Sequence, residues 1–135
     1  MFKKSAFILL CFTVFLSVNS CKKTPGQGGN ASIKGTFWSR NYDPFFTIVK
    51  GRYPSVNKTV YLFFGDDVSP GTSVNTNADG QFEFKYLRKG KYRVVVYSSQ
   101  FQSTSTTPNS VPLEYDVELT KRKEVKDIGL DTINQ

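Results

Sequence analysis

Residues 75–97 read NTNADGQFEFKYLRKGKYRVVVY, and this stretch decides the fold of the 135-residue chain. Asp79 and Gly80 form a strong two-residue turn signal, because both residues tolerate the positive φ that a type I′ hairpin turn requires. Beyond the turn, apolar residues alternate with polar ones in the period of a strand that buries one face, and the apolar positions are Phe82, Phe84 and Tyr86. We therefore predict a hairpin here, with one strand ending near Ala78 and the next beginning after Gly80.

A second turn signal follows at residues 87–92, which read LRKGKY and precede a run of three valines. Leu, Gly and Tyr at these offsets resemble the tyrosine corner of Greek-key sandwiches, in which a Tyr at the start of a strand bonds back to upstream backbone. Tyr92 occupies that position. The strands on either side of the corner are predicted to be adjacent and antiparallel, and the expected fold is a small all-β sandwich.

Other segments supply the remaining strands of this sandwich. In residues 31–38 the alternation puts Ile33 and Phe37 on one face, whereas residues 59–64 are apolar on both faces, as in a central strand. The predicted strands are residues 31–38, 59–64, 73–77, 81–86, 92–97, 114–119 and 125–130, with 45–50 as a possible extra edge strand. Residues 98–112 are predicted to be a mobile loop, and residues 131–135 to fray. The prediction is a single all-β Greek-key sandwich of about seven strands.

The N-terminus has the pattern of a bacterial export signal, with a basic start, an apolar run over residues 6–18 and a small residue, Ser20, before Cys21. Residues 18–21, VNSC, resemble the lipobox of bacterial lipoproteins. That resemblance implies cleavage before Cys21 and acylation of this residue, and Asn19 resembles the looser lipobox of Bacteroidota. The domains expected are a signal peptide at 1–20, a lipidated Cys with a flexible tether at 21–30, and a sandwich at 31–135. The alternative is ordinary secretion with Cys21 as a free thiol.

The residues after Cys21 bear on where an anchored protein would lie. Lys22 is not the Asp that resembles an inner-membrane retention signal, and residues 22–25 lack the acidic run that resembles a surface-export tag. These resemblances imply the cell envelope, with the periplasmic leaflet of the outer membrane favoured over the cell surface. Without Lys3 and Lys4 the net charge falls from +7 to +5. A basic surface can meet anionic lipid or acidic glycan, but a solvated face is favoured, and nucleic acid is not an expected partner.

Four segments together resemble a known family. SIKGTF at 32–37, VYLFF at 60–64, the stretch 76–97 and KDIGL at 126–130 are similar to the carboxypeptidase regulatory-like, transthyretin-type (prealbumin-like) β-sandwich. The resemblance covers most of residues 31–130, with an enlarged connection after the first strand. It implies a non-catalytic module that often serves as an accessory to enzymes, transporters or surface assemblies.

The residue types present argue against catalysis. The chain contains no His, and Cys21 is assigned to the anchor, so His-based nucleophilic triads and His-ligated zinc are excluded and no enzyme activity is expected. Asn75, Asn77 and Asp79 match the start of a calcium loop, but its twelfth position would be Tyr86 rather than Glu. A weaker alternative is a Ca²⁺ site built from two loops, and its ligands would be Asp66, Asp67 and Asp79. No other cofactor is expected.

Aromatic residues concentrate in the connection after the first strand and are the candidates for binding. They are Trp38, Tyr42, Phe45, Phe46 and Tyr53. Such side chains can anchor a protein partner or stack on a sugar, although they can also form a satellite core beneath the connection. The expected function is a protein-interaction or scaffolding module of the envelope, acting through this loop or by strand addition. The alternative is a carbohydrate-binding module in which Trp38 and Tyr42 form a stacking platform.

Overall fold

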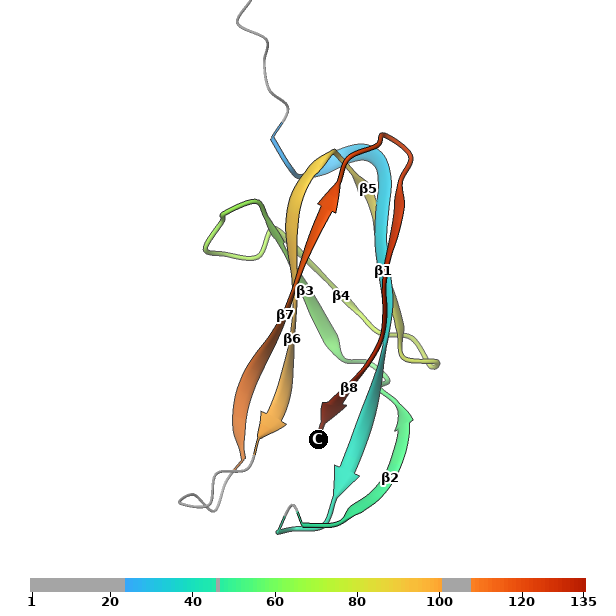
Figure 1. The fold of residues 1–135 in the computed structure, drawn as a ribbon, viewed down its shortest axis with the longest axis vertical. Helices are drawn as coiled ribbons and strands as arrows, with labels where there is room; N and C mark the ends of the chain where they lie inside the picture. Colours follow the sequence, from blue (N-terminus) through green and yellow to red (C-terminus); the bar gives the residue numbers. More distant parts are fainter. Residues whose placement is uncertain (1–23, 46, 101–107) are drawn as a thin grey trace, which may run out of the picture.

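The computed structural model describes residues 24–45, 47–100 and 108–135 as a β-sandwich (Figure 1). None of these residues forms a helix, so the described part contains no helix long and apolar enough to cross a membrane. The strands are β1 (Gln27–Tyr42), β2 (Val49–Pro54), β3 (Thr59–Phe64), β4 (Thr72–Asn75), β5 (Gln81–Leu87), β6 (Gly90–Gln100), β7 (Asn109–Leu119) and β8 (Val125–Asn134).

Two four-stranded sheets make the two layers. One has the order β4-β3-β6-β7 and is antiparallel throughout. The other is built around β1, which pairs with β8 in parallel and with β5 and β2 antiparallel. The predicted all-β sandwich is confirmed, and β3 is central as predicted. The extra edge strand exists, but it spans Val49–Pro54 instead of residues 45–50.

One long strand, β1, changes its partner halfway along one edge. Residues up to Thr36 pair with β5, and residues from Trp38 onward pair with β2. Phe37 marks the change, because its N–H donates to the carbonyl of Gly80 (2.8 Å) and its carbonyl accepts from the N–H of Ser55 (2.9 Å). Both β5 and β2 are therefore held in place by one continuous strand.

The core lies between the sheets and is apolar and aromatic. Phe37 stacks on Phe82 with ring centroids 5.2 Å apart, and Phe64 meets Tyr92 edge to face. Val117 and Leu119 are buried and Tyr115 packs against the core, as the alternation in β7 predicts. The fully or almost fully buried apolar residues are Ala31, Ile33, Phe37, Val60, Leu62, Phe82, Phe84, Leu87, Tyr92, Val94, Val95, Val96, Val117, Leu119 and Ile133.

The predicted tyrosine corner is confirmed. The Tyr92 hydroxyl donates to the carbonyl of Arg88 (2.7 Å) and accepts from the N–H of Gly26 (2.9 Å). The N–H of Arg88 in turn donates to the Gly26 carbonyl (2.9 Å). The corner therefore binds the N-terminal segment as well as its own loop. Residues 27–30, expected to belong to a flexible tether, are part of β1.

The Asp79-Gly80 turn forms, but it does not join a hairpin. The Asn77 side chain closes the turn by accepting hydrogen bonds from the N–H groups of Asp79 and Gln81. The strand before the turn, β4, pairs with β3, whereas the strand after it, β5, pairs with β1 in the other sheet. Likewise β5 and β6 lie in different sheets. The hairpin prediction and the predicted β5–β6 pairing are therefore wrong, because both turns carry the chain from one layer to the other.

Three further predictions are corrected at strand ends. Tyr86, expected on the buried face, is 70% exposed, because its φ of 60° puts a kink before Leu87, which is buried in its place. The predicted loop over residues 98–112 is shorter, since β6 reaches Gln100 and β7 begins at Asn109; residues 101–107 lie outside the described residues. The chain end does not fray, because β8 continues to Asn134 and buries Ile133.

Candidate functional site

The aromatic connection is a hairpin of β1 and β2. Pairing runs from Trp38 opposite Pro54 to Tyr42 opposite Val49, with a register shift beside Tyr42. This hairpin projects at the lower end of the molecule in Figure 1, opposite the end where the N-terminal segment leaves. The enlarged connection after the first strand is thus largely a paired β-hairpin.

The Asp43 carboxylate organises the loop between the two strands. One oxygen accepts hydrogen bonds from the N–H groups of Thr47 (2.6 Å) and Ile48 (2.8 Å), and the other accepts from the Thr47 hydroxyl (2.7 Å). The backbone adds a bond from the Asp43 N–H to the Ile48 carbonyl (3.0 Å). The Ile48 N–H and the Thr47 hydroxyl stabilise the charged form and lower the pKa of Asp43.

This closed loop presents apolar side chains to solvent. Phe45 is 74% exposed, Ile48 66% and Val49 48%, and we call these three residues the hairpin tip. Tyr53 is 42% exposed, further along β2. Phe45 and Tyr53 are thus not members of a buried satellite core. Phe46 lies outside the described residues.

Trp38 lies apart from the tip, in a shallow recess on the outer face of the β1 sheet. The recess has a volume of about 240 Å³ and is lined by residues of β1, β2 and β8, namely Trp38, Arg52, Leu130 and Thr132. Arg52 Nη2 donates to the Thr132 hydroxyl at 3.4 Å. The indole is partly buried, and the Leu130 side chain beside it is 64% exposed. We call this feature the Trp38 recess.

Two tyrosines hold the flanks of the hairpin. Arg40 lies between Trp38 and Tyr42 on β1, and its Nη1 donates to the Tyr42 hydroxyl at 3.3 Å. The Tyr53 hydroxyl donates to Gln135 Oε1 at 3.2 Å, which ties β2 to the end of the chain. The four aromatic candidates that the structure describes therefore do not form one cluster, because the tip and the recess are separate features of the same hairpin.

The weak calcium candidates are not brought together. Asp66 and Asp67 lie on the loop between β3 and β4, whereas Asp79 lies on the turn between β4 and β5. Within the described residues, no three His, Cys, Asp or Glu side chains are placed so that they could hold a metal ion. The side-chain oxygen of Asn77, a further residue of the calcium-loop pattern, already accepts two backbone hydrogen bonds.

Some residues of the hairpin site were missed in the sequence. Asp43 precedes Pro44, a dipeptide that favours turn initiation, so its role in the loop had a local signal. Arg52, Leu130 and Thr132 had no local sequence signal. They lie beside Trp38 because β2 and β8 pair with β1 in a particular register, which the sequence does not reveal.

Two solved structures align with parts of this chain. A crystal structure of a Pseudomonas aeruginosa protein that is proposed to bind carbohydrate aligns with a TM-score of 0.50 and 15% identity, over 83% of this chain and 92% of that one. A Cyanothece 9R-lipoxygenase aligns over 93% of this chain and 20% of its own, with a TM-score of 0.38 and 16% identity. No protein-family model and no curated protein matches the chain. The first of these likenesses shows the fold alone.

Proposed function

We propose that the chain is a non-enzymatic binding module of the bacterial envelope, lipidated on Cys21, which docks a protein partner through the hairpin tip. The observation that carries this proposal is the exposure of Phe45, Ile48 and Val49 on a loop that the Asp43 carboxylate holds closed. Exposed apolar side chains that gather on an ordered loop mark interaction surfaces more often than single exposed ones do.

The chemistry of the tip favours a protein over a sugar. Ile48 and Val49 are aliphatic and offer neither a ring for stacking nor a donor for hydroxyl groups. Burial of such a side chain is worth about 1.5–3 kcal/mol relative to full exposure, so a partner with an apolar pocket gains several kcal/mol. Lys50 and Arg52 on β2 discourage strand addition at this edge. Docking therefore proceeds through side chains of the tip.

The proposed location of the protein is the periplasmic leaflet of the outer membrane. Acyl chains on Cys21 provide stable anchoring, because two or more chains exceed the marginal affinity of one. Mass spectrometry of the protein extracted from membranes tests this point directly. The expected product begins at Cys21 and carries acyl groups, and a Cys21→Ala variant is expected in the soluble fraction. An unmodified Cys21 would overturn the anchor.

Site-directed photo-crosslinking in cells tests the docking surface. A photoreactive amino acid replaces Ile48 in one variant, and in the control variant it replaces Val68, which is 94% exposed on the β3–β4 loop. We expect one dominant envelope protein to be crosslinked from position 48 and not from position 68. Equal products from both positions, or none from position 48, would remove the hairpin tip as a docking surface.

The Trp38 recess supports carbohydrate binding as a second candidate. An indole face beside an Arg guanidinium and a Thr hydroxyl combines a stacking surface with hydrogen-bond donors. The volume of about 240 Å³ is below the range of roughly 300–1,000 Å³ usual for ligand pockets, which suits one sugar ring more than a chain. The likeness in fold to a protein proposed to bind carbohydrate is consistent with this candidate.

Affinity electrophoresis in gels that contain polysaccharide separates the two candidates. If sugar binds in the recess, Trp38→Ala abolishes retardation, Trp38→Phe keeps part of it, and Phe45→Ala has no effect. If only the tip binds a ligand, none of the three variants changes mobility in any glycan. Loss of crosslinking in Phe45→Ala, with crosslinking retained in Trp38→Ala, would then support the protein partner.

A further inference from the structure

Five cationic side chains gather at the end of the sandwich from which the N-terminal segment leaves. Arg88 and Lys89 lie on the corner between β5 and β6, and Lys121, Arg122 and Lys123 lie on the turn between β7 and β8. Figure 1 places both loops at the same end of the molecule, and Arg88, Lys89 and Arg122 line one recess there. We call these five residues the basic end.

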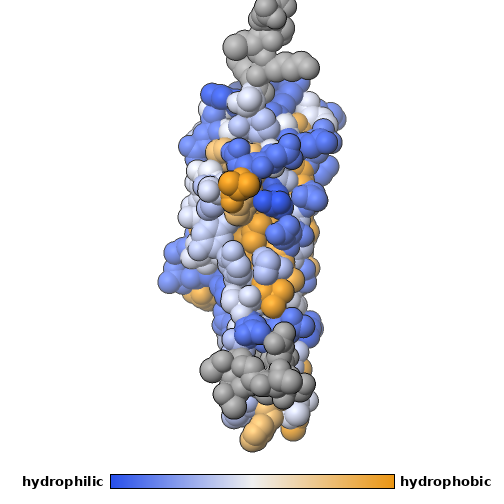
Figure 2. Space-filling model, turned by 90° about the vertical axis from the view of Figure 1, so that its left-hand side faces the viewer, coloured by the Kyte–Doolittle hydropathy of each residue, from blue (hydrophilic) through white to orange (hydrophobic). Residues whose placement is uncertain are grey.

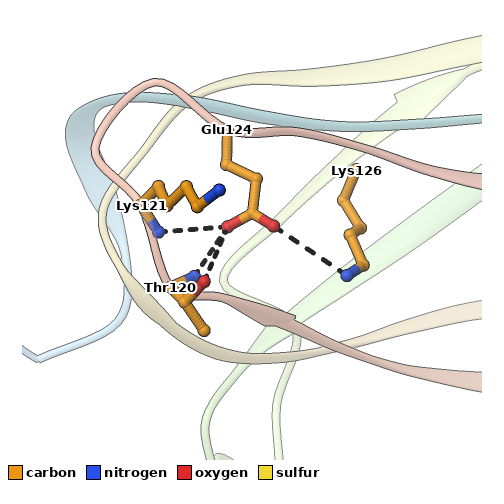
Figure 3. Close-up of polar contacts among 4 residues, drawn as sticks. All are labelled: Thr120, Lys121, Glu124 and Lys126. Atoms are coloured by element: carbon orange, nitrogen blue, oxygen red, sulfur yellow. Dashed lines mark hydrogen bonds and ion pairs between the residues drawn. The ribbon is translucent and has the colours of Figure 1, made fainter.

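Carboxylates leave this positive charge largely uncompensated. Among the described residues, the ion pairs do not include any cation of the basic end; their cations are Lys34, Lys85, Arg93 and Lys126. Glu124 belongs to the same turn, but one of its oxygens accepts hydrogen bonds from the backbone N–H groups of Thr120 (2.7 Å) and Lys121 (3.1 Å) (Figure 3). These N–H groups lower the pKa of Glu124 and commit its carboxylate to closing the turn.

A bulge in β1 opens the recess between the two loops. The register passes from Gln27 opposite Leu87 to Ala31 opposite Leu87, so residues 28–30 lie outside the ladder. The Arg88 guanidinium lies over Gly28, where an added Cβ would be 3.1 Å from the nearer nitrogen. The recess has a volume of about 600 Å³, and its lining joins residues 28–30 and Leu87 to the cationic residues Arg88, Lys89 and Arg122. Its size and charge suit a phosphate headgroup.

The attachment of Gly26 to the tyrosine corner determines how far this end can move from a lipid anchor. Gly26 follows Cys21 by five positions, and a fully extended chain of that length spans at most about 18 Å. The tether is thus about half as long as a flexible segment through residue 30 would be. If Cys21 is acylated, as the proposed function has it, the basic end is kept within about two Debye lengths of the bilayer surface.

We infer that the basic end is a docking surface for the phosphate groups of an anionic lipid bilayer. Each Lys or Arg close to such a surface contributes about 1 kcal/mol, or about a fivefold gain in partitioning. Figure 2 shows mainly hydrophilic residues around this end, whereas hydrophobic residues appear along the middle of that face and at the opposite end. The contact holds the sandwich upright on the membrane and directs the hairpin tip away from it.

Vesicle sedimentation of the chain from Lys22 onward tests the inference without any acyl group. All eight strands and the core lie within this chain, so it contains the complete fold. We expect binding to vesicles that contain phosphatidylglycerol, no binding to phosphatidylcholine alone, and release as salt rises. The variant Lys89→Glu, Arg122→Glu, Lys123→Glu alters three exposed side chains and is expected to lower the partition coefficient about 100-fold or more.

A control variant with the same change in net charge separates a local surface from bulk charge. It carries Lys34→Glu, Lys50→Glu and Lys85→Glu, all of them exposed and none of them among the five residues of the basic end. We expect this variant to keep most of the binding, and equal losses in both variants would overturn the inference. Because no acyl group is present, the outcome is independent of whether Cys21 is modified.

Inorganic phosphate distinguishes a lipid surface from a soluble ligand. NMR spectra recorded in phosphate and in chloride at equal ionic strength are expected to show the same amide shifts for Gly28 and Gly29. Phosphatidylglycerol vesicles are expected to broaden those signals selectively. Saturable shifts in phosphate alone, with displacement of the protein from vesicles, would assign the recess to a free anion and overturn the lipid-surface assignment.

Discussion

Tyr92 is a residue on which several parts of the fold depend at once. Its ring packs in the core against Phe64. Its hydroxyl accepts a hydrogen bond from the Gly26 N–H and donates one to the Arg88 carbonyl. Tyr92→Phe keeps the ring and leaves the two backbone groups without this partner in a buried place. We expect a loss of about 1–3 kcal/mol in the free energy of unfolding, measured by urea denaturation.

The control for this substitution is Tyr97→Phe, on the same strand but with a side chain that is 42% exposed. Its free energy of unfolding should change by less than about 0.5 kcal/mol. In Tyr92→Phe, amide hydrogen exchange should also accelerate at Gly26 and along the start of β1. A loss of stability without faster exchange at Gly26 would mean that the hydroxyl does not hold the N-terminal segment.

Asp43 gives a second prediction at this scale. Its folded-state pKa is lowered, so its contribution to loop order is present above the ordinary pKa of 3.8 and is lost as pH falls through the lower folded value. Between pH 5 and 8 the loop should therefore be unaffected by pH. Asp43→Ala should speed exchange of the Thr47 and Ile48 amides with little change in global stability, and Asp66→Ala should leave those amides unchanged. An NMR titration midpoint above 3.8 for Asp43 would contradict the assignment.

Single residues also show what the sequence can and cannot reveal. The tyrosine corner was predictable, because its hydrogen bond is local and joins Tyr92 to Arg88, four residues earlier in the sequence. The burial of Tyr86 was predicted wrongly, since strict alternation assumes a regular strand and this residue has positive φ. The next residue, Leu87, is buried in the core in place of Tyr86. Period-2 patterns do not reveal such kinks.

At the scale of elements, the turn at Gly80 positions two sheets relative to each other. An added Cβ at Gly80 would lie 2.2 Å from the Phe37 carbonyl oxygen, and the residue has a φ of +74°. Gly80→Ala must therefore displace β1 or the turn at the point where β1 changes partner. We expect it to lower the free energy of unfolding by at least about 2 kcal/mol.

Two other glycines separate the causes of that loss. Gly129 has a φ of +85° with no atom within 4 Å of the added Cβ, so Gly129→Ala should cost only the backbone strain of about 1 kcal/mol. Gly51 also has open space around it and no positive φ, so Gly51→Ala should change stability by less than about 0.5 kcal/mol. Equal losses at positions 80 and 129 would show that the close approach to Phe37 is unimportant.

The same turn shows why strand positions were predictable from the sequence and strand partners were not. Strands β3 and β5 were located almost to the residue, because their apolar runs and turn signals are local. Their partners were not predictable, since Asp79-Gly80 is equally compatible with a hairpin and with a crossing between layers. The choice depends on long-range contacts, here the bond between the Phe37 N–H and the Gly80 carbonyl. The Trp38 recess depends on register in the same way, which is why only its indole was identified in the sequence.

At the scale of the whole molecule, the two ends of the sandwich differ in chemistry. The basic end and the N-terminal exit lie at one end, and the hairpin tip lies at the other (Figure 1). Strand β1 connects them with 16 residues, which at about 3.3 Å each span up to about 50 Å. A protein anchored through Cys21 and docked through the basic end would therefore present the tip far from the bilayer.

Energy transfer from a labelled residue to acceptors on the membrane surface measures this orientation. In the acylated protein on phosphatidylglycerol vesicles, a donor at Val125→Cys, beside the β7–β8 turn, should transfer strongly, and a donor at Ile48→Cys should transfer weakly. Both side chains are at least 60% exposed, so labelling should not disturb the core. Charge reversal at Lys89, Arg122 and Lys123 should reduce the difference, because the tether alone permits many orientations. Stronger transfer from position 48 than from position 125 would mean that the apolar tip inserts into lipid, and its assignment to a protein partner would then be wrong.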